Sequence, residues 1–268
     1  MKKMTKFFAL ALLAGAMVSC STEDTAPSVQ NDKVAVQFTG GISVNTRAAG
    51  LAWAEGDMIG IFMTGTKQPL SADAIQEGVD NICYQTSGSI GFSPVSGGKT
   101  VFFPIDGDVD FYSYYPQTTV NDYKVALDVT DQGKQEAIDF MYAKTEGCNK
   151  ATPQVFLKFY HKLSNLVLDV QPGNGLTQED LKKMTVTVKG QNTKATFNLA
   201  DGTISGEENP ADITMKTTEA GKLYEAILLP TEEASRVIEF DLNNGYDAPF
   251  VWTMPVKLEG GKRYHYTV

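Results

Sequence analysis

The amino-acid sequence predicts an all-β protein made of two tandem β-sandwiches with few short helices. Apolar and polar residues alternate over many short stretches, which is the two-residue period of a β-strand. Clusters of Gly, Asn, Asp and Pro separate these stretches, as turns do in sandwiches. A length of 268 residues, 42% of them hydrophobic, is enough for two such cores.

The first twenty residues are predicted to be a lipoprotein signal peptide. A basic start at residues 1–6 precedes an apolar run at residues 7–18, which is too short to span a bilayer as a helix. Ser19 then precedes Cys20, and a small residue before a cysteine marks where bacterial lipoproteins are cut and acylated. We therefore expect a lipidated Cys20. The alternative is an ordinary secretory signal followed by an unrelated thiol.

The net charge argues against nucleic acid as a partner. The formal charge is −9, and removal of Lys2, Lys3 and Lys6 with the signal would take it to −12. A protein this acidic repels a phosphate backbone, and the sequence has no basic stripe. The remaining cysteines, Cys83 and Cys148, are too few for a disulfide framework in a chain of this length, and we expect them to be unpaired.

The first sandwich is assigned to residues 33–150, after a polar stretch at residues 21–32 that is predicted to be a flexible tether. It begins with a strand in which Val34, Val36 and Phe38 alternate with other residues. Further strands are predicted at residues 58–63, 101–103, 110–115, 125–129 and 139–143.

The second sandwich is assigned to residues 151–268, so the boundary between the two sets lies near residue 150. The best helix signal lies at residues 177–183, where Thr177 can cap the first turn and Leu176 can pack on Leu181. Strands are predicted at residues 155–160, 163–170, 184–188, 195–199, 223–229, 237–242, 251–254 and 263–268.

No motif identifies a reaction. The two histidines, His161 and His265, fall in predicted strands, where sheet or interface positions explain them most simply. The sequence contains no Gly-x-Ser-x-Gly, His-Glu-x-x-His, Cys-x-x-Cys or phosphate-binding loop. We therefore expect no catalytic activity, no cofactor and no metal site. A glycosidase needs only two suitably placed carboxylates, so that class remains a less favoured alternative.

Two segments can be interpreted in more than one way. Residues 106–110, which contain three aspartates, are interpreted first as a turn that leads into a strand, with an incidental calcium site as the alternative. Tyr112, Tyr114 and Tyr115 have the spacing of core or half-exposed sheet residues, with a sugar-stacking platform as the alternative.

Several short segments, taken in order along the chain, carry a family resemblance. They are Cys20, Asn45-Thr46-Arg47 after the first strand, residues 53–62 (WAEGDMIGIF), residues 111–116 (FYSYYP), residues 139–143 (DFMYA), residues 155–166 (VFLKFYHKLSNL) with residues 173–176 (GNGL), and the closing residues 258–268 (LEGGKRYHYTV). Together they resemble the fimbrillin-like family of Bacteroidales-type outer-membrane lipoproteins, the type V pilins. The resemblance covers essentially the whole chain and implies two consecutive transthyretin-like β-sandwiches.

The resemblance also implies an assembly route. Family subunits reach the outer membrane as lipoproteins, and an arginine-specific protease then removes the lipidated N-terminal segment together with the first strand. The groove left behind accepts a donor strand from the C-terminal region of the next subunit. In this chain, Val34, Val36 and Phe38 would be the plug that is removed. A sandwich that lacks an edge strand exposes unpaired backbone groups and an apolar slot, which an incoming strand can fill.

Arg47 is the predicted cut site, with Ala48 as the new N-terminus. The other arginines, Arg236 and Arg263, lie in or beside predicted strands, where a protease cannot easily bind an extended substrate. The alternative is a solvated loop arginine in a protein that stays lipidated. Family subunits that polymerise carry a further C-terminal segment, whereas this sequence ends at Val268, so we expect the chain to accept a strand rather than donate one.

The sequence thus predicts a non-catalytic cell-surface fimbrial subunit, or an accessory, anchor or adhesive protein of a pilus. The expected partners are other pilin subunits, the outer membrane through the lipid, and a host or bacterial surface ligand. The expected location is the surface of the outer membrane, and the fimbrium after processing. The alternative function is a glycan-binding outer-membrane surface lipoprotein that uses exposed tyrosines and acidic loops.

Overall fold

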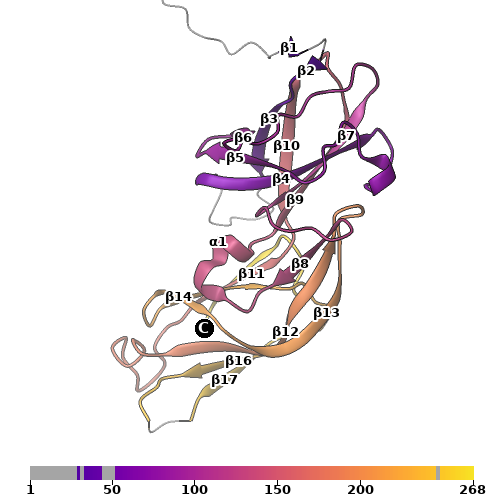
Figure 1. Cartoon of the computed structure of the whole chain (residues 1–268). Coiled ribbons are helices and arrows are strands. Elements are labelled where there is room, and N and C mark those ends of the chain that lie inside the picture. The colour runs from indigo at the N-terminus through magenta and orange to yellow at the C-terminus, as the bar shows by residue number, and fades with distance from the viewer. Residues whose placement is uncertain (1–28, 31–32, 44–51, 246–247) are drawn as a thin grey trace, which may run out of the picture.

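The structure, a computed structural model of the chain, describes residues 29–30, 33–43, 52–245 and 248–268. These residues are mostly β-strand, which confirms the predicted all-β class. Figure 1 shows the strands gathered into two units that lie end to end. Within the described ranges, no helix is long and apolar enough to cross a membrane. The predicted signal peptide and the sites at Cys20, Arg47 and Ala48 lie outside the described residues.

The first unit is a closed barrel rather than the expected sandwich. Its strand order is β10–β3–β6–β5–β4–β7–β9, and β10 also pairs with β9. Because β10 bonds to β3 on one side and β9 on the other, it joins the edges that a sandwich would leave open. The bounds are β3 (Gln37–Ile42), β4 (Glu55–Gly65), β5 (Ile82–Ser87), β6 (Gly91–Pro94), β7 (Val109–Tyr115), β9 (Met141–Cys148) and β10 (Gln154–His161).

Smaller elements flank the barrel strands. A two-residue ladder joins β1 (Val29–Gln30) to β2 (Lys33–Val34), and a 3-10 turn, η1 (Ala72–Ala74), follows β4. The predicted strand at residues 101–103 forms a single bridge between Phe102 and Ala35.

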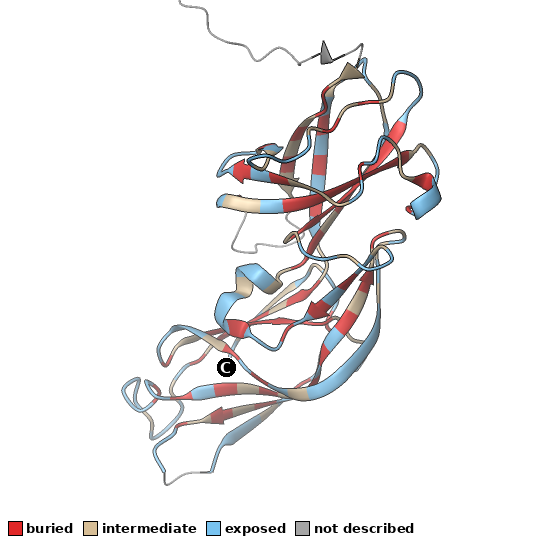
Figure 2. Cartoon of the chain, in the orientation of Figure 1, coloured by how far each residue is buried: buried red, intermediate tan, exposed pale blue. Residues whose placement is uncertain are grey.

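The second unit has two sheets. One has the order β14–β15–β11–β18, and the other has the order β13–β12–β16–β17 with β8 also bonded to β12. Figure 2 shows buried residues along the strands of both sheets. The bounds are β8 (Lys124–Asp128), η2 (Gln132–Lys134), α1 (Gln135–Ile138), β11 (Ser164–Asp169), β12 (Thr185–Asn198), β13 (Thr203–Thr214), β14 (Lys216–Glu219), β15 (Leu223–Leu228), β16 (Arg236–Asp241), β17 (Phe250–Met254) and β18 (Arg263–Thr267).

The hydrogen bonding divides the chain differently from the expected boundary near residue 150. β8 precedes that boundary but pairs with β12 of the second unit, and β10 follows it but pairs within the barrel. Figure 1 shows β8 and α1 among the strands of the second unit. The chain therefore passes between the units three times, at residues 116–123, 139–140 and 162–163.

The β7 strand forms a wall between two hydrophobic cores. All seven of its residues are buried. Phe111 and Tyr115 pack into the barrel core, whereas Tyr112 and Tyr114 pack into the core that continues into the second unit. Because Tyr112, Tyr114 and Tyr115 are 1%, 0% and 8% exposed, the sugar-stacking alternative for these three rings is wrong.

The predicted helix at residues 177–183 is replaced by hydrogen-bonded turns. One half of the capping box forms, since the Thr177 amide donates to Asp180 Oδ2 at 2.7 Å. Leu181 is buried and Leu176 packs against the same core. The turns thus bury Leu181 and cover part of Leu176, and the chain enters β12 shortly afterwards.

Candidate functional site

The strand β3 lies between two neighbours in the barrel wall. It runs parallel to β10, from Gln37 opposite Gln154 to Ile42 opposite Phe159, and antiparallel to β6. Just before it, the Val36 amide donates to the Val101 carbonyl at 2.9 Å. β3 is therefore the N-terminal segment that closes the barrel between β6 and β10.

The predicted plug residues differ in how deeply they are buried. Phe38 is 2% exposed, and its ring meets Tyr84 and Phe111 edge-on, with centroids 5.2 Å and 5.1 Å apart. Val36 is 6% exposed, whereas Val34 is half-buried. Full burial of a side chain of this size contributes about 1.5–3 kcal/mol. Phe38 and Val36 thus anchor the segment in the barrel core.

Trp53 contacts β3 although it follows β3 in the chain, after residues 44–51, which lie outside the described ranges. Its Nε1 donates to the Gly40 carbonyl at 2.8 Å in a buried position. The indole also packs edge-on against Phe92 and Phe159, each with a centroid distance of 5.1 Å. In the sequence, Trp53 stands out only as part of a family segment. Its hydrogen bond to β3 depends on a tertiary contact that no local pattern signals.

The removal of β3 would leave a defined groove. Its floor would be the aromatic cluster of Trp53, Tyr84, Phe92, Phe111 and Phe159, which β3 now covers. Its walls would be the facing edges of β6 and β10, because both now bond to β3. Unpaired strand edges beside an apolar slot are the features that bind an added strand.

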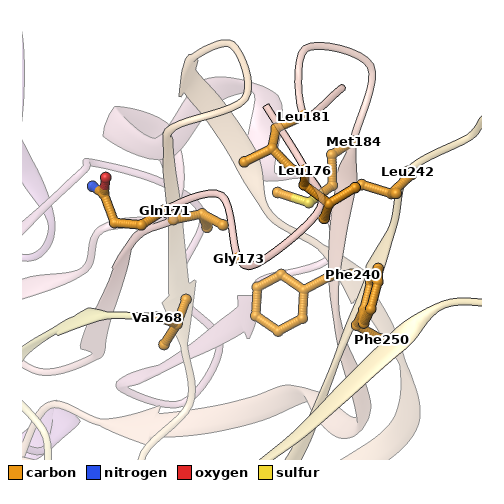
Figure 3. A pocket seen from close by; sticks show the side chains of 10 residues that line it. Gln171, Gly173, Leu176, Leu181, Met184, Phe240, Leu242, Phe250 and Val268 are labelled. Carbon is orange, nitrogen blue, oxygen red and sulfur yellow. The ribbon is translucent and has the colours of Figure 1, made fainter. Parts of the chain in front are cut away.

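A separate apolar cavity of about 200 Å³ lies in the second unit. Figure 3 shows Phe240 and Phe250 projecting towards it from strands β16 and β17. Among the described residues that line it, none is an acid, a base or a nucleophile, so these side chains offer no group for acid–base or covalent chemistry. The lining residues are Val170, Gln171, Gly173, Leu176, Leu181, Met184, Phe240, Leu242, Phe250 and Val268.

His161, Asp139 and Lys162 lie at the junction between the units, and their side chains contact other side chains of the protein. His161 Nδ1 lies 2.9 Å from Asp139 Oδ1, at two of the points where the chain passes between units. Next to it, burial lowers the pKa of Lys162, whose ammonium lies over the rings of Tyr142 and Phe197. His161 therefore occupies the interface position that the sequence suggested.

The acidic segment at residues 106–110 begins in a bend and leads into β7, whose second residue is Asp110. Asp110 is fully buried and accepts hydrogen bonds from Thr66 Oγ1, the Lys67 amide and the Gly147 amide at 2.9–3.0 Å. Among the described residues, no group of three or more candidate ligands is placed to hold a metal ion. The carboxylate of Asp110 thus links the turn after β4 to the end of β9, the two strands that flank β7.

The second histidine and the two cysteines lie on strands other than β3. His265 is exposed on β18, and Cys83 and Cys148 are unpaired, as predicted.

The fold and this site define an all-β protein with two units, and β3, the first of the barrel strands in chain order, completes the first unit. The chain belongs to the fimbrillin-like family, whose sequence profile matches residues 46–268. The matched region begins at Thr46 and so leaves β1, β2 and β3 outside it. The resemblance drawn from the sequence segments is thereby confirmed.

Known proteins of the genus Bacteroides share this fold. The chain is 33% identical to the "Putative fimbrium subunit Fim1C" of Bacteroides uniformis, over 96% of this chain and 88% of that protein. It also matches a solved structure described as a "putative cell adhesion protein" from Bacteroides uniformis, with a TM-score of 0.74, 31% identity and coverage of 89% and 94% of the two chains. A similarly described structure from Bacteroides ovatus gives a TM-score of 0.68 and 26% identity, covering 87% of this chain and 91% of its own.

Proposed function

We propose that this protein is a non-catalytic subunit, or an accessory or anchor subunit, of a fimbrium on the bacterial surface. Its barrel accepts a strand from another subunit after the N-terminal segment has been cut after Arg47. Family membership and the relative described as a fimbrium subunit support the fimbrial part of this proposal. The burial and the position of β3 support the strand-accepting part.

The position of β3 in the chain carries the proposal. It is N-terminal to Arg47, whereas every strand that pairs with it, and Trp53, follow Arg47. A cut at the Arg47–Ala48 bond would therefore turn β3 from a covalent part of the barrel into a bound peptide. Hydrogen bonds and buried side chains would still hold that peptide, so an incoming strand with similar contacts can replace it.

The N-terminal lipid completes the proposed route. We place an acyl group on Cys20, which anchors the precursor to the outer membrane, with the residues between Cys20 and β1 as a tether, because β1 already pairs with β2. The cut after Arg47 then separates the barrel from its anchor. A Cys20→Ala variant should lose acylation and membrane retention. Its appearance in the outer membrane in acylated form would contradict the proposed anchor.

The tyrosines that suggested the glycan-binding alternative are not available to bind a sugar. The tyrosines of β7 that suggested a sugar platform are buried, Tyr112 and Tyr114 in one core and Tyr115 in the other. We therefore favour assembly with other subunits as the function of this chain.

The experiment that tests the proposal treats the purified precursor with a protease that cuts after arginine but not after lysine, and follows intact mass and particle size. We expect one product that begins at Ala48, followed by oligomers once a subunit with a free donor strand is added. An Arg47→Lys variant is the matched control, because it keeps the charge but removes the arginine. A folded precursor that stays uncut, or an equal cut in the variant, would show that Arg47 is not the processing site.

A further inference from the structure

Two consecutive glycines in β3 face opposite sides of the barrel wall. Gly40 is buried and faces inwards like Phe38, whereas Gly41 faces outwards. Each lies against aromatic rings that leave no room for a side chain at ordinary contact distance. Neither has a positive φ, so space, rather than backbone conformation, explains the two glycines.

On the inner side, the rings cannot easily give way. A Cβ on Gly40 would lie 2.8 Å from Phe92 Cε2 and 3.2 Å from Phe159 Cε2. Phe92 and Phe159 are 6% and 0% exposed, and both pack edge-on against Trp53. A close-packed aromatic cluster resists an added methyl group, because every ring that moves displaces another.

On the outer side, the ring is free to move. A Cβ on Gly41 would lie 2.8 Å from Phe156 Cζ. That distance equals the inner one, but Phe156 is 53% exposed and can turn towards solvent. Alanine at Gly40 and alanine at Gly41 would therefore meet a ring at the same distance, but only the ring at Gly41 can move away.

We propose that the groove selects its donor strand by size at two positions. The strand that replaces β3 must place a large apolar side chain where Phe38 lies and a glycine where Gly40 lies, two residues further on. The partner is thus a subunit segment with the pattern large apolar residue, any residue, glycine. This inference rests on the proposed strand exchange and specifies which strands can take part in it.

The backbone of Gly40 also forms hydrogen bonds with the groove, through both its carbonyl and its amide. Trp53 Nε1 donates to the Gly40 carbonyl at 2.8 Å, and the Gly40 amide donates to the Ile90 carbonyl at 2.7 Å. A donor strand must therefore bring its own backbone to within hydrogen-bond distance of the indole. A side chain at this position would hold the strand away from both partners, so the loss of space and the loss of hydrogen bonds act together.

The first arm of the test needs no cleavage. Full-length Gly40→Ala and Gly41→Ala chains are compared with the unsubstituted chain by denaturant unfolding. We expect Gly40→Ala to lower the midpoint clearly and Gly41→Ala to leave it nearly unchanged. Equal midpoints for the two variants would overturn the size argument.

The second arm measures exchange. The chain cut after Arg47 is titrated with fluorescein-labelled synthetic peptides of residues 33–43, either unsubstituted or carrying the alanine of Gly40→Ala or of Gly41→Ala, and anisotropy reports binding. We expect the Gly41→Ala peptide to bind like the unsubstituted one and the Gly40→Ala peptide to bind at least about tenfold more weakly. A Trp252→Phe background leaves Trp53 as the one tryptophan, whose emission reports directly on the groove.

The outcomes separate the two proposals. Equal binding of all three peptides overturns the selection by size and leaves strand exchange standing. Failure of the unsubstituted peptide to exchange overturns the proposed function, and the donor pattern with it.

Discussion

Cys148 shows how the surroundings of one residue set its chemistry. Burial, together with the nearby carboxylates of Asp110 and Asp108, raises the pKa of its thiol to about 11. The Cys83 thiol also has a raised pKa, again because of burial. Neither residue is paired. A thiol that stays protonated at neutral pH is a poor nucleophile, so Cys148 should be chemically quiet in the folded chain.

We predict a distinctive pH dependence for the alkylation of Cys148 by iodoacetamide. At pH 8 the rate should be about 100-fold below that of the unfolded chain, and it should rise with pH until about 11. Because the unfolded thiol ionises at a lower pH than the folded one, the folded state loses stability as pH rises from the ordinary thiol pKa towards 11. Peptide mass spectrometry reads Cys148 and Cys83 separately. A native rate at pH 8 equal to that in urea would contradict the prediction.

The burial of single residues was predictable where apolar residues alternate regularly along the sequence. The alternation of Val34, Val36 and Phe38 predicted a single strand, and Val36 and Phe38 are buried. The structure divides that segment, with Val34 in β2, Phe38 in β3 and Val36 between them. The partners of Trp53 and Gly40 were not predictable, because their hydrogen bond joins segments on either side of residues 44–51. The burial on both faces of β7 was also hidden, since an aromatic strand looks the same whether one face or two are covered.

At the scale of elements, a glutamine side chain joins the turn η2 to a strand. Gln132 is 5% exposed, its Nε2 donates to the Ile227 carbonyl at 2.9 Å, and its Oε1 accepts from the Ile227 amide at 2.9 Å. One side chain thus satisfies both backbone groups of a residue in β15. This pairing attaches the segment between β8 and β9 to the second unit.

We predict that Gln132→Leu lowers the free energy of unfolding by about 2–4 kcal/mol, because it leaves a buried amide and a buried carbonyl unpaired. Gln135→Leu is the matched control. Gln135 donates to the Glu225 carbonyl at 3.1 Å and weakly to Gln132 Oε1 at 3.3 Å, from a less buried position. Because the Ile227 amide still reaches Gln132, the loss of Gln135 should cost less than about 1 kcal/mol. Urea unfolding of both variants measures the difference. Similar values for the two variants would mean that the Ile227 pairing contributes little.

Most strands could be predicted from the sequence, but several of their partners could not. Alternation located the strands that became β7, β8, β10, β11, β15 and β16. It did not indicate that β8 would pair with β12 or that β10 would pair in parallel with β3. The local pattern reports which face of a strand is apolar, whereas pairing depends on which distant segment meets that strand.

At the scale of the whole molecule, the two units are not independent pieces of chain. A cut near residue 150 would separate β10 from its barrel partners and β8 from β12. The core that includes Tyr112 and Tyr114 also continues into the second unit. Each unit therefore needs residues from both sides of the boundary that the sequence suggested.

We predict that a fragment of residues 151–268 does not fold alone, because it lacks β8 and carries an unpaired β10. Circular dichroism should show no cooperative thermal transition. Addition of a fragment of residues 29–150 should restore one, since β8 and β10 would then regain their partners. A sharp transition for the shorter fragment by itself would show that residues 151–268 form an autonomous domain.

The three passages between the units have a mechanical consequence. Two domains joined by one linker transmit a pull through a single backbone segment, which can swing or stretch. Here tension between the barrel and the second unit is divided among the segments at residues 116–123, 139–140 and 162–163. The junction between the units should therefore resist bending. When force is applied to the chain, a strand within one unit should detach before the two units separate.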